Sequence, residues 1–152
     1  DDWEAFRDVR LRALSDAPDS FGQTLAASAA QPDDVWRERA HAGGPVVLAF
    51  AEGRAVAMGG LLLPADAAAG FVWGMWVEPA WRGQGLAGRM VRLLLDLAGS
   101  EGRPALLHVA EGNEAARGLY ESHGFVATGD WQPLRDGSDV RIETMRWEPT
   151  PR

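Results

Sequence analysis

The stretch that decides the fold is WVEPAWRGQGLA at residues 76–87. An apolar run ends at Val77, Pro79 stops a strand, and two glycines precede a helical pattern. Such a turn leaves backbone N–H groups unpaired at the positive end of a helix dipole, which suits a phosphate. Glycine allows the phosphate to approach the main chain and permits a positive φ. A plain connection between a strand and a helix has the same features.

The hydrophobic pattern on either side of this turn alternates between helical and strand periods. Helices are expected around Phe6–Ala13, at Asp33–His41, from Leu86 to Gly99 and at Asn113–His123. Strands are expected at Val46–Ala51, Ala55–Leu63, Phe71–Val77, Ala105–Ala110, Phe125–Trp131 and Val140–Trp147. The predicted apolar stripe of the third helix is Leu86, Met90, Leu93, Leu94 and Leu97. This order predicts an α/β (α+β) protein, with helices packed on a mixed sheet.

A dinucleotide-binding turn is one alternative for the glycine stretch. Gly83, Gly85 and Gly88 satisfy the G-x-G-x-x-G fingerprint, and Glu111 ends a strand further on. In that fold, however, the first glycine follows the strand almost directly. Here residues 78–82 intervene, and the preceding strands pattern as antiparallel neighbours. The sequence therefore argues against dinucleotide binding.

A second block, NEAARGLYESHGF at residues 113–125, supports a different interpretation. It resembles the Asn-x-x-Ala-x-x-Leu-Tyr-x-x-x-Gly-Phe signature of the GNAT superfamily of N-acetyltransferases. RGQGLA at residues 82–87 is similar to the family's Arg/Gln-x-x-Gly-x-Gly/Ala loop, and the lead-in from Met75 to Pro79 is also similar. The two blocks lie in the family's order, about 30 residues apart. The resemblance covers essentially the whole chain and is weakest before residue 45.

The resemblance implies a GNAT-like acyl-CoA N-acyltransferase fold in a single domain, residues 1–152. Its sheet would be mostly antiparallel, with the parallel central strands 71–77 and 105–110 splaying apart at their C-terminal ends. Members usually begin with a strand before the first helix, whereas this sequence opens on the helix, so we expect that strand to be absent. The edge left unpaired would favour a homodimer.

The resemblance also implies the reaction. Acetyl-CoA would be the co-substrate, and a primary amine of a small molecule or peptide would attack it directly in a ternary complex. The residues expected to hold acetyl-CoA are Met75, Trp76, Val77, Arg82, Gly83, Gln84, Gly85, Leu86, Ala87, Asn113 and Tyr120. Main-chain N–H groups near Met75–Val77 would stabilise charge on the thioester oxygen. Asn113 by itself also fits a helix N-cap.

Tyr120 is the only tyrosine in the chain, and the resemblance makes it the general acid for the CoA thiolate. The general base is open. Relatives place a Glu or His where this sequence has Phe71 and Trp73, which cannot titrate. Glu111 and His108 are the remaining candidates, although His108 also fits a core residue. Glu78 is close in sequence but fits a solvated loop carboxylate as well.

Phe21 and Trp73 are expected to line an apolar acceptor pocket, with ordinary core packing as the alternative. A different function is also compatible with the sequence. A GNAT-like module could bind acyl-CoA and sense it without turnover. The missing strand base favours that module, whereas Tyr120 and the intact glycine loop favour the enzyme.

The composition limits the partners. The formal charge of −7 argues against nucleic acid and modestly favours a cationic partner. No apolar run approaches the roughly 18 residues that span a bilayer, so no membrane association is expected. The chain has no Cys, which removes disulfides and cysteine metal sites, and no metal is expected. The cytoplasm is the expected compartment.

Overall fold

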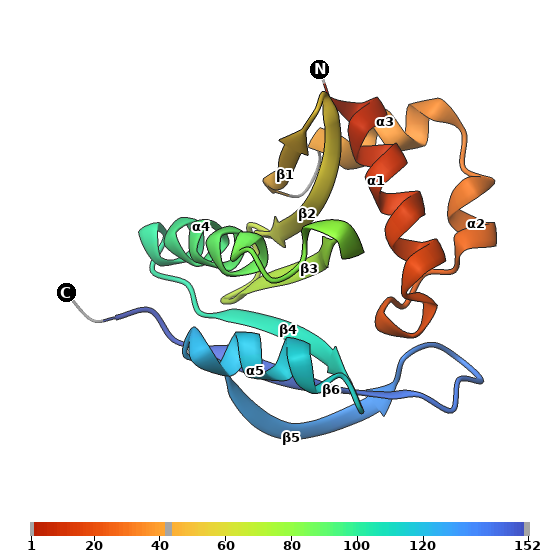
Figure 1. The fold of residues 1–152 in the computed structure, drawn as a ribbon. Helices are drawn as coiled ribbons and strands as arrows, with labels where there is room; N and C mark the ends of the chain where they lie inside the picture. The colour runs from red at the N-terminus through yellow and green to blue at the C-terminus, as the bar shows by residue number, and fades with distance from the viewer. Residues whose placement is uncertain (1, 42–43, 151–152) are drawn as a thin grey trace.

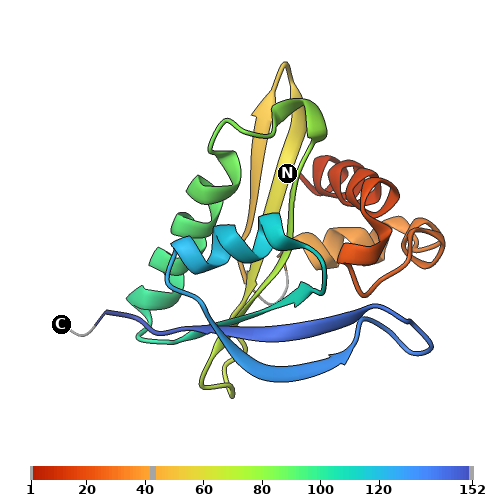
Figure 2. The same cartoon turned by 60° about the horizontal axis from the view of Figure 1, so that its bottom comes forward.

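The computed structural model describes residues 2–41 and 44–150, which form a six-stranded sheet with helices on both faces (Figures 1 and 2). The helices are α1 Trp3–Asp16, α2 Leu25–Ala29, α3 Asp33–His41, α4 Leu86–Ser100 and α5 Glu114–Ser122, with short 3-10 turns η1 Pro18–Ser20 and η2 Pro79–Trp81. The strands are β1 Val46–Ala51, β2 Arg54–Leu62, β3 Gly70–Val77, β4 Ala105–Ala110, β5 Val126–Pro133 and β6 Arg141–Trp147. They lie in the order β1-β2-β3-β4-β6-β5.

The predicted mixed sheet is confirmed. All neighbouring strands are antiparallel except β3 and β4, which are parallel. The sequence missed α2, a five-residue helix that begins where the Thr24 side chain accepts a hydrogen bond from the Ala27 amide. In the described residues no strand precedes α1.

Each face of the sheet carries its own hydrophobic core. Figure 2 shows α4 and the α1–α3 group on opposite sides of β1, β2 and β3. On the α1 side, the rings of Phe6 and Trp36 pack edge to face, with their centroids 5.6 Å apart, and contact Met58 and Trp76. On the other side, the buried residues of α4 and α5 pack with those of β3, β4 and β6. The sheet is therefore covered by helices on both faces.

The predicted stripe of α4 is partly wrong. Leu93 and Leu97 are 52% and 40% exposed, while Leu94 is fully buried. The buried face is made by Met90, Val91, Leu94, Leu95 and Ala98. Because leucines occupy more than one side of α4, helical spacing alone is compatible with two overlapping apolar faces and does not show which one is buried.

The centre of the sheet opens because β3 and β4 pair over only a short length. Their paired positions are Gly70 with Ala105 and Phe71 with Leu106, after which the strands separate, as the resemblance predicted. A β-bulge lies just beyond this point. Trp73 pairs with Gly60 and Trp76 with Met58, so β3 holds one extra residue there.

Gly74 occupies the bulge with φ +68°, and a Cβ on it would lie 2.9 Å from Met58 Cε. A residue other than glycine would be strained and crowded at this position. The bulge bends β3 where the strands part, so both irregularities open the same region of the sheet.

The assignment of the buried α4 face predicts different effects for two adjacent leucines. Leu94→Ala should lower the free energy of unfolding by about 2–5 kcal/mol, because it leaves a cavity in the core. Leu93→Ala is the matched control and should change it by roughly 0.5 kcal/mol or less. Urea unfolding followed by tryptophan fluorescence measures both, and equal losses would show that another face of α4 is packed.

Candidate active site

A cavity of about 610 Å³ opens where β3 and β4 separate. Its walls come from β3, β4, the turn at residues 82–87 (here called the glycine turn), α5 and the loop after α1. It therefore collects side chains from both faces of the sheet. The predicted site residues among its walls are Phe21, Trp73, Met75, Trp76, Val77, Arg82, Gly83, Gly85, Leu86, Ala87, His108, Asn113 and Tyr120. Gln84 and Glu111 do not line it.

The glycine turn forms one end of the cavity. Gly83 and Gly85 have φ values of +79° and +81°, and Gly85 is the N-cap of α4. Gly85 makes no side-chain cap, so the first amides of α4 depend on other acceptors. Around either glycine, nothing lies within 4 Å of the place a Cβ would take. This open, donor-rich turn fits a phosphate at the positive end of the helix dipole.

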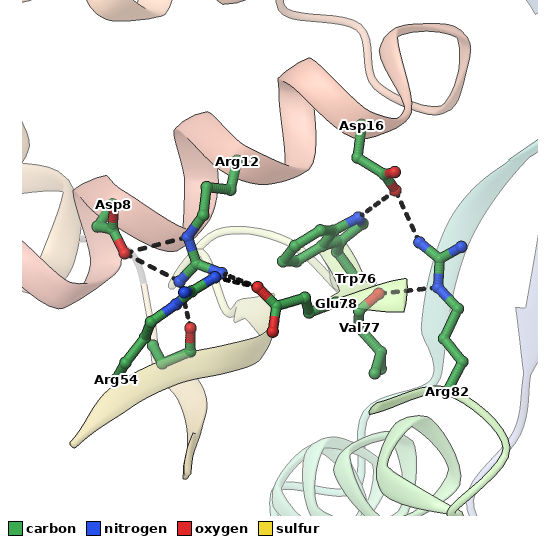
Figure 3. A network of polar contacts seen from close by, with 9 residues as sticks. Asp8, Arg12, Asp16, Arg54, Trp76, Val77, Glu78 and Arg82 are labelled. Carbon is green, nitrogen blue, oxygen red and sulfur yellow. Dashed lines mark hydrogen bonds and ion pairs between the residues drawn. The ribbon is translucent and has the colours of Figure 1, made fainter. Parts of the chain in front are cut away.

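Arg82 fastens the turn to the end of β3. Its Nε donates to the Val77 carbonyl at 2.9 Å and its Nη2 to Asp16 Oδ2 at 2.7 Å (Figure 3). Asp16 also accepts a hydrogen bond from Trp76 Nε1 at 3.0 Å. That hydrogen bond, with smaller contributions from the hydrogen bond and charge of Arg82, lowers the pKa of Asp16 against the opposing effect of burial. Asp16 lines the cavity, and sequence reasoning missed it because its partners lie more than 50 residues away along the chain.

Glu78 is held by two arginines. Arg12 Nη1 lies 3.0 Å from Glu78 Oε1, and Arg54 donates to the same oxygen (Figure 3). The Glu78 side chain is only 19% exposed and does not line the cavity. The prediction of a solvated loop carboxylate is wrong. Glu78 instead joins α1, β2 and the end of β3.

Tyr120 and Asn113 lie on the α5 side of the cavity. Tyr120 is 7% exposed, its ring meets Phe125 edge to face at 5.9 Å, and burial raises the pKa of its hydroxyl to about 12. The Asn113 side chain accepts from the Ala116 amide at 3.2 Å. Asn113 is therefore a helix N-cap, as predicted, that also lines the cavity.

The two candidate bases differ in their surroundings. His108 lines the cavity and is exposed rather than part of the core. Its ring meets Phe71 edge to face at 4.8 Å, and partial burial lowers its pKa, with a smaller opposing effect of Asp130. Glu111 Oε1 accepts from the Arg141 amide at 3.1 Å, and its Oε2 lies 3.5 Å from Arg141 Nη2. Of the two, only His108 reaches the cavity.

Phe21 and Trp73 lie on the α1 side. Phe21 is 7% exposed and follows η1, whereas Trp73 belongs to β3 next to the bulge. Both line the cavity and both also belong to the α1-side core. Packing and pocket lining are therefore both correct for these two residues.

Comparisons with known proteins agree with this geometry. The family model described as acetyltransferase (GNAT) family matches residues 4–125. The chain therefore belongs to the acetyltransferase (GNAT) family. No curated protein sequence matches it.

Several solved structures share the fold. The yncA protein of Salmonella typhimurium, solved with its cofactor acetyl-CoA, is 18% identical, with a TM-score of 0.76 over 99% of this chain and 90% of that one. The ribosomal-protein-alanine N-acetyltransferase of Brucella melitensis is 20% identical, with a TM-score of 0.75 over 97% and 94%. A Bacillus anthracis protein described as a streptothricin acetyltransferase, in complex with acetyl coenzyme A, is 18% identical with a TM-score of 0.60. That alignment covers 71% of this chain and 64% of the other. At these identities the likeness establishes the fold.

Within residues 2–41 and 44–150, no helix has the length and apolar character of a membrane span. The same residues contain no group of three or more His, Cys, Asp or Glu arranged to hold a metal ion.

Proposed function

We propose that this protein transfers the acetyl group of acetyl-CoA to a primary amine of a small molecule or peptide, by direct attack of the amine in a ternary complex. One observation carries the proposal. A single cavity joins the glycine turn, Tyr120 and the Phe21–Trp73 wall through the gap between β3 and β4. Two substrates entering from opposite faces of the sheet would meet there. Holding both in one groove removes much of the entropic barrier to their reaction.

The donor side would use the main chain. Amides between Gly83 and Ala87 would bind the pyrophosphate, and the edge of β3 from Met75 to Val77 is free to pair with the pantetheine arm because β4 has moved away. Acetyl-CoA supplies an activated thioester. Arg82 is engaged with Asp16 and Val77, so it supports the turn and adds positive charge beside it.

The chemistry requires a proton donor for the thiolate and an acceptor for the amine proton. Tyr120 suits the first role, because a hydroxyl with a pKa of about 12 stays protonated at neutral pH. His108 suits the second, because its lowered pKa keeps the imidazole neutral at that pH. Glu111 suits it less, since Arg141 neutralises its charge outside the cavity.

We propose further that residues 1–152 act as one domain in the cytoplasm. Both faces of the same sheet contribute to the cavity, so neither half of the chain carries the site alone.

Thiol release tests the proposed function. The purified protein, acetyl-CoA and a broad panel of primary amines are mixed, and free CoA is measured with a thiol reagent. Release that depends on one class of amine, together with an acetylated product seen by mass spectrometry, is the expected result. Binding of acetyl-CoA without release by any amine would contradict transfer and favour an acyl-CoA-sensing module.

Tyr120→Phe tests the proton donor. We expect kcat to fall by roughly 10²-fold or more, since the variant lacks only the hydroxyl. The packing against Phe125 should survive, so the melting temperature and the Kd for acetyl-CoA serve as controls. Unchanged turnover in this variant would remove Tyr120 from the mechanism.

His108 predicts a pH dependence. Protonated imidazole cannot accept a proton, so kcat/KM should fall as the pH drops through the pKa of His108, with a midpoint below about 6.5. His108→Gln should lose this acid limb and most of its activity at neutral pH. The amine itself also titrates, so the profile is repeated with amines of different pKa. An acid limb that persists in His108→Gln would assign it to another group.

A further inference from the structure

Arg10 carries a buried positive charge on the inner side of α1. The residue is only 5% exposed, and burial, together with the nearby Arg39, lowers its pKa to about 10, so it remains charged at neutral pH. Its Nη2 donates to Gln23 Oε1 at 3.2 Å. Its Nε and Nη1 are buried and have no hydrogen-bond partner among the described residues. A desolvated guanidinium in this state is destabilising unless further oxygen acceptors reach it.

Apart from Gln23 Oε1, the polar groups that the structure places beside Arg10 are donors. Arg39 Nη2 donates at 3.1 Å to the same Gln23 oxygen, so two guanidinium groups share one amide carbonyl. Trp73 Nε1 is also buried without a partner in the described part of the chain. Within that part, neither Arg10 nor Arg39 forms an ion pair with a carboxylate. The cluster has an excess of positive charge and of N–H groups.

This cluster lies directly behind the acceptor end of the cavity. The Arg10 guanidinium lies 4.8 Å from the centre of the Phe21 ring and 5.7 Å from that of Trp73, and both rings line the cavity. Arg10 Nη1 lies 3.5 Å from the position that a Cβ on Gly74 would occupy. Gly74 also lines the cavity. Because glycine has no side chain, none extends from this position between the cavity and the Arg10 guanidinium.

We infer that the α1-side end of the cavity is an anion subsite, in which Arg10 binds a carboxylate of the acceptor, and that the acceptor is an amino acid or a similar small amine acid. The inference rests on the proposed function for the identity of the acceptor. A guanidinium matches a carboxylate in shape and in hydrogen-bonding pattern. Arg10 does not itself line the cavity, because the rings of Phe21 and Trp73 lie against its guanidinium, so the inference requires the Phe21 ring to turn aside when the ligand binds.

Matched substrates test the subsite. The common L-amino acids are compared with their carboxamides and with their decarboxylated amines in the thiol-release assay. At least one acid should exceed both neutral counterparts in kcat/KM by roughly 10-fold or more, the size expected for a charge-assisted hydrogen bond. Both counterparts are needed because the amide lowers the pKa of the reacting amine and decarboxylation raises it.

Arg10→Met should lower kcat/KM for the acid more than for its carboxamide, so that the preference for the acid is lost. The matched control is Arg7→Met on the same helix, where Arg7 forms a partly exposed ion pair with Asp33 at 2.9 Å. That variant should keep the preference for the acid. If Arg10→Met does not fold, Arg10→Lys keeps the charge but loses the planar guanidinium, and it should reduce the preference.

A binding measurement separates this inference from the proposed function. The melting temperatures of the wild type and of Arg10→Met, or of Arg10→Lys if the former does not fold, are measured with each acid and its carboxamide in the presence of CoA. If no amine is acetylated, transfer fails, yet a carboxylate-dependent rise in the wild type that the variant lacks still supports the subsite. The inference is overturned if no acid is preferred over its carboxamide in turnover and no acid stabilises the wild type more than the variant.

Discussion

The short parallel pairing of β3 and β4 is the constraint on which the rest of the molecule depends. Two strands in a sheet normally satisfy each other's main-chain groups, but these two part after Phe71 and Leu106. The edges beyond that point are held apart because β3 is paired with β2 and β4 with β6 on their outer sides. Helices pack on both faces of the sheet, yet the facing edges of β3 and β4 beyond this point keep main-chain groups that are not paired with each other.

The separated strands are kept in place by polar ties rather than by apolar packing alone. Asp16 links the end of α1 to Trp76 and to Arg82, and Glu78 links α1 and β2 to the residue that follows β3. Both carboxylates therefore fasten the α1 layer to the strand that carries the glycine turn. The first helix of the chain thus helps to position the glycine turn at one end of the cavity.

The order of the strands and helices apart from α2, and the limits of β1, β4 and α3, could be predicted from the sequence, because alternation, glycine and proline are local signals. The cavity residues that were predicted, about half of its lining, came mainly from the family resemblance. The separation of β3 and β4 was likewise predicted from the family resemblance and not from local patterns. Local patterns failed where a partner is distant. The pairing of Glu78 with Arg12 spans 66 residues, and the buried face of α4 depends on which strands it meets. The burial of Arg10 was equally invisible, since a charged residue on a helix normally faces solvent.

Arg10 also shows why net charge is a poor guide to this site. The chain carries a formal charge of −7, which by itself favours a cationic partner. Charges on the surface are screened by salt over about 8–10 Å, whereas a desolvated guanidinium acts in a medium of much lower dielectric constant. If the proposed anion subsite operates, the acidic surface attracts the ammonium form of the acceptor from solution, and Arg10, behind Phe21 and Trp73, binds its carboxylate. An acceptor that carries both groups and binds Arg10 through its carboxylate would direct its amine away from Arg10, toward the gap between β3 and β4 where we propose that transfer takes place.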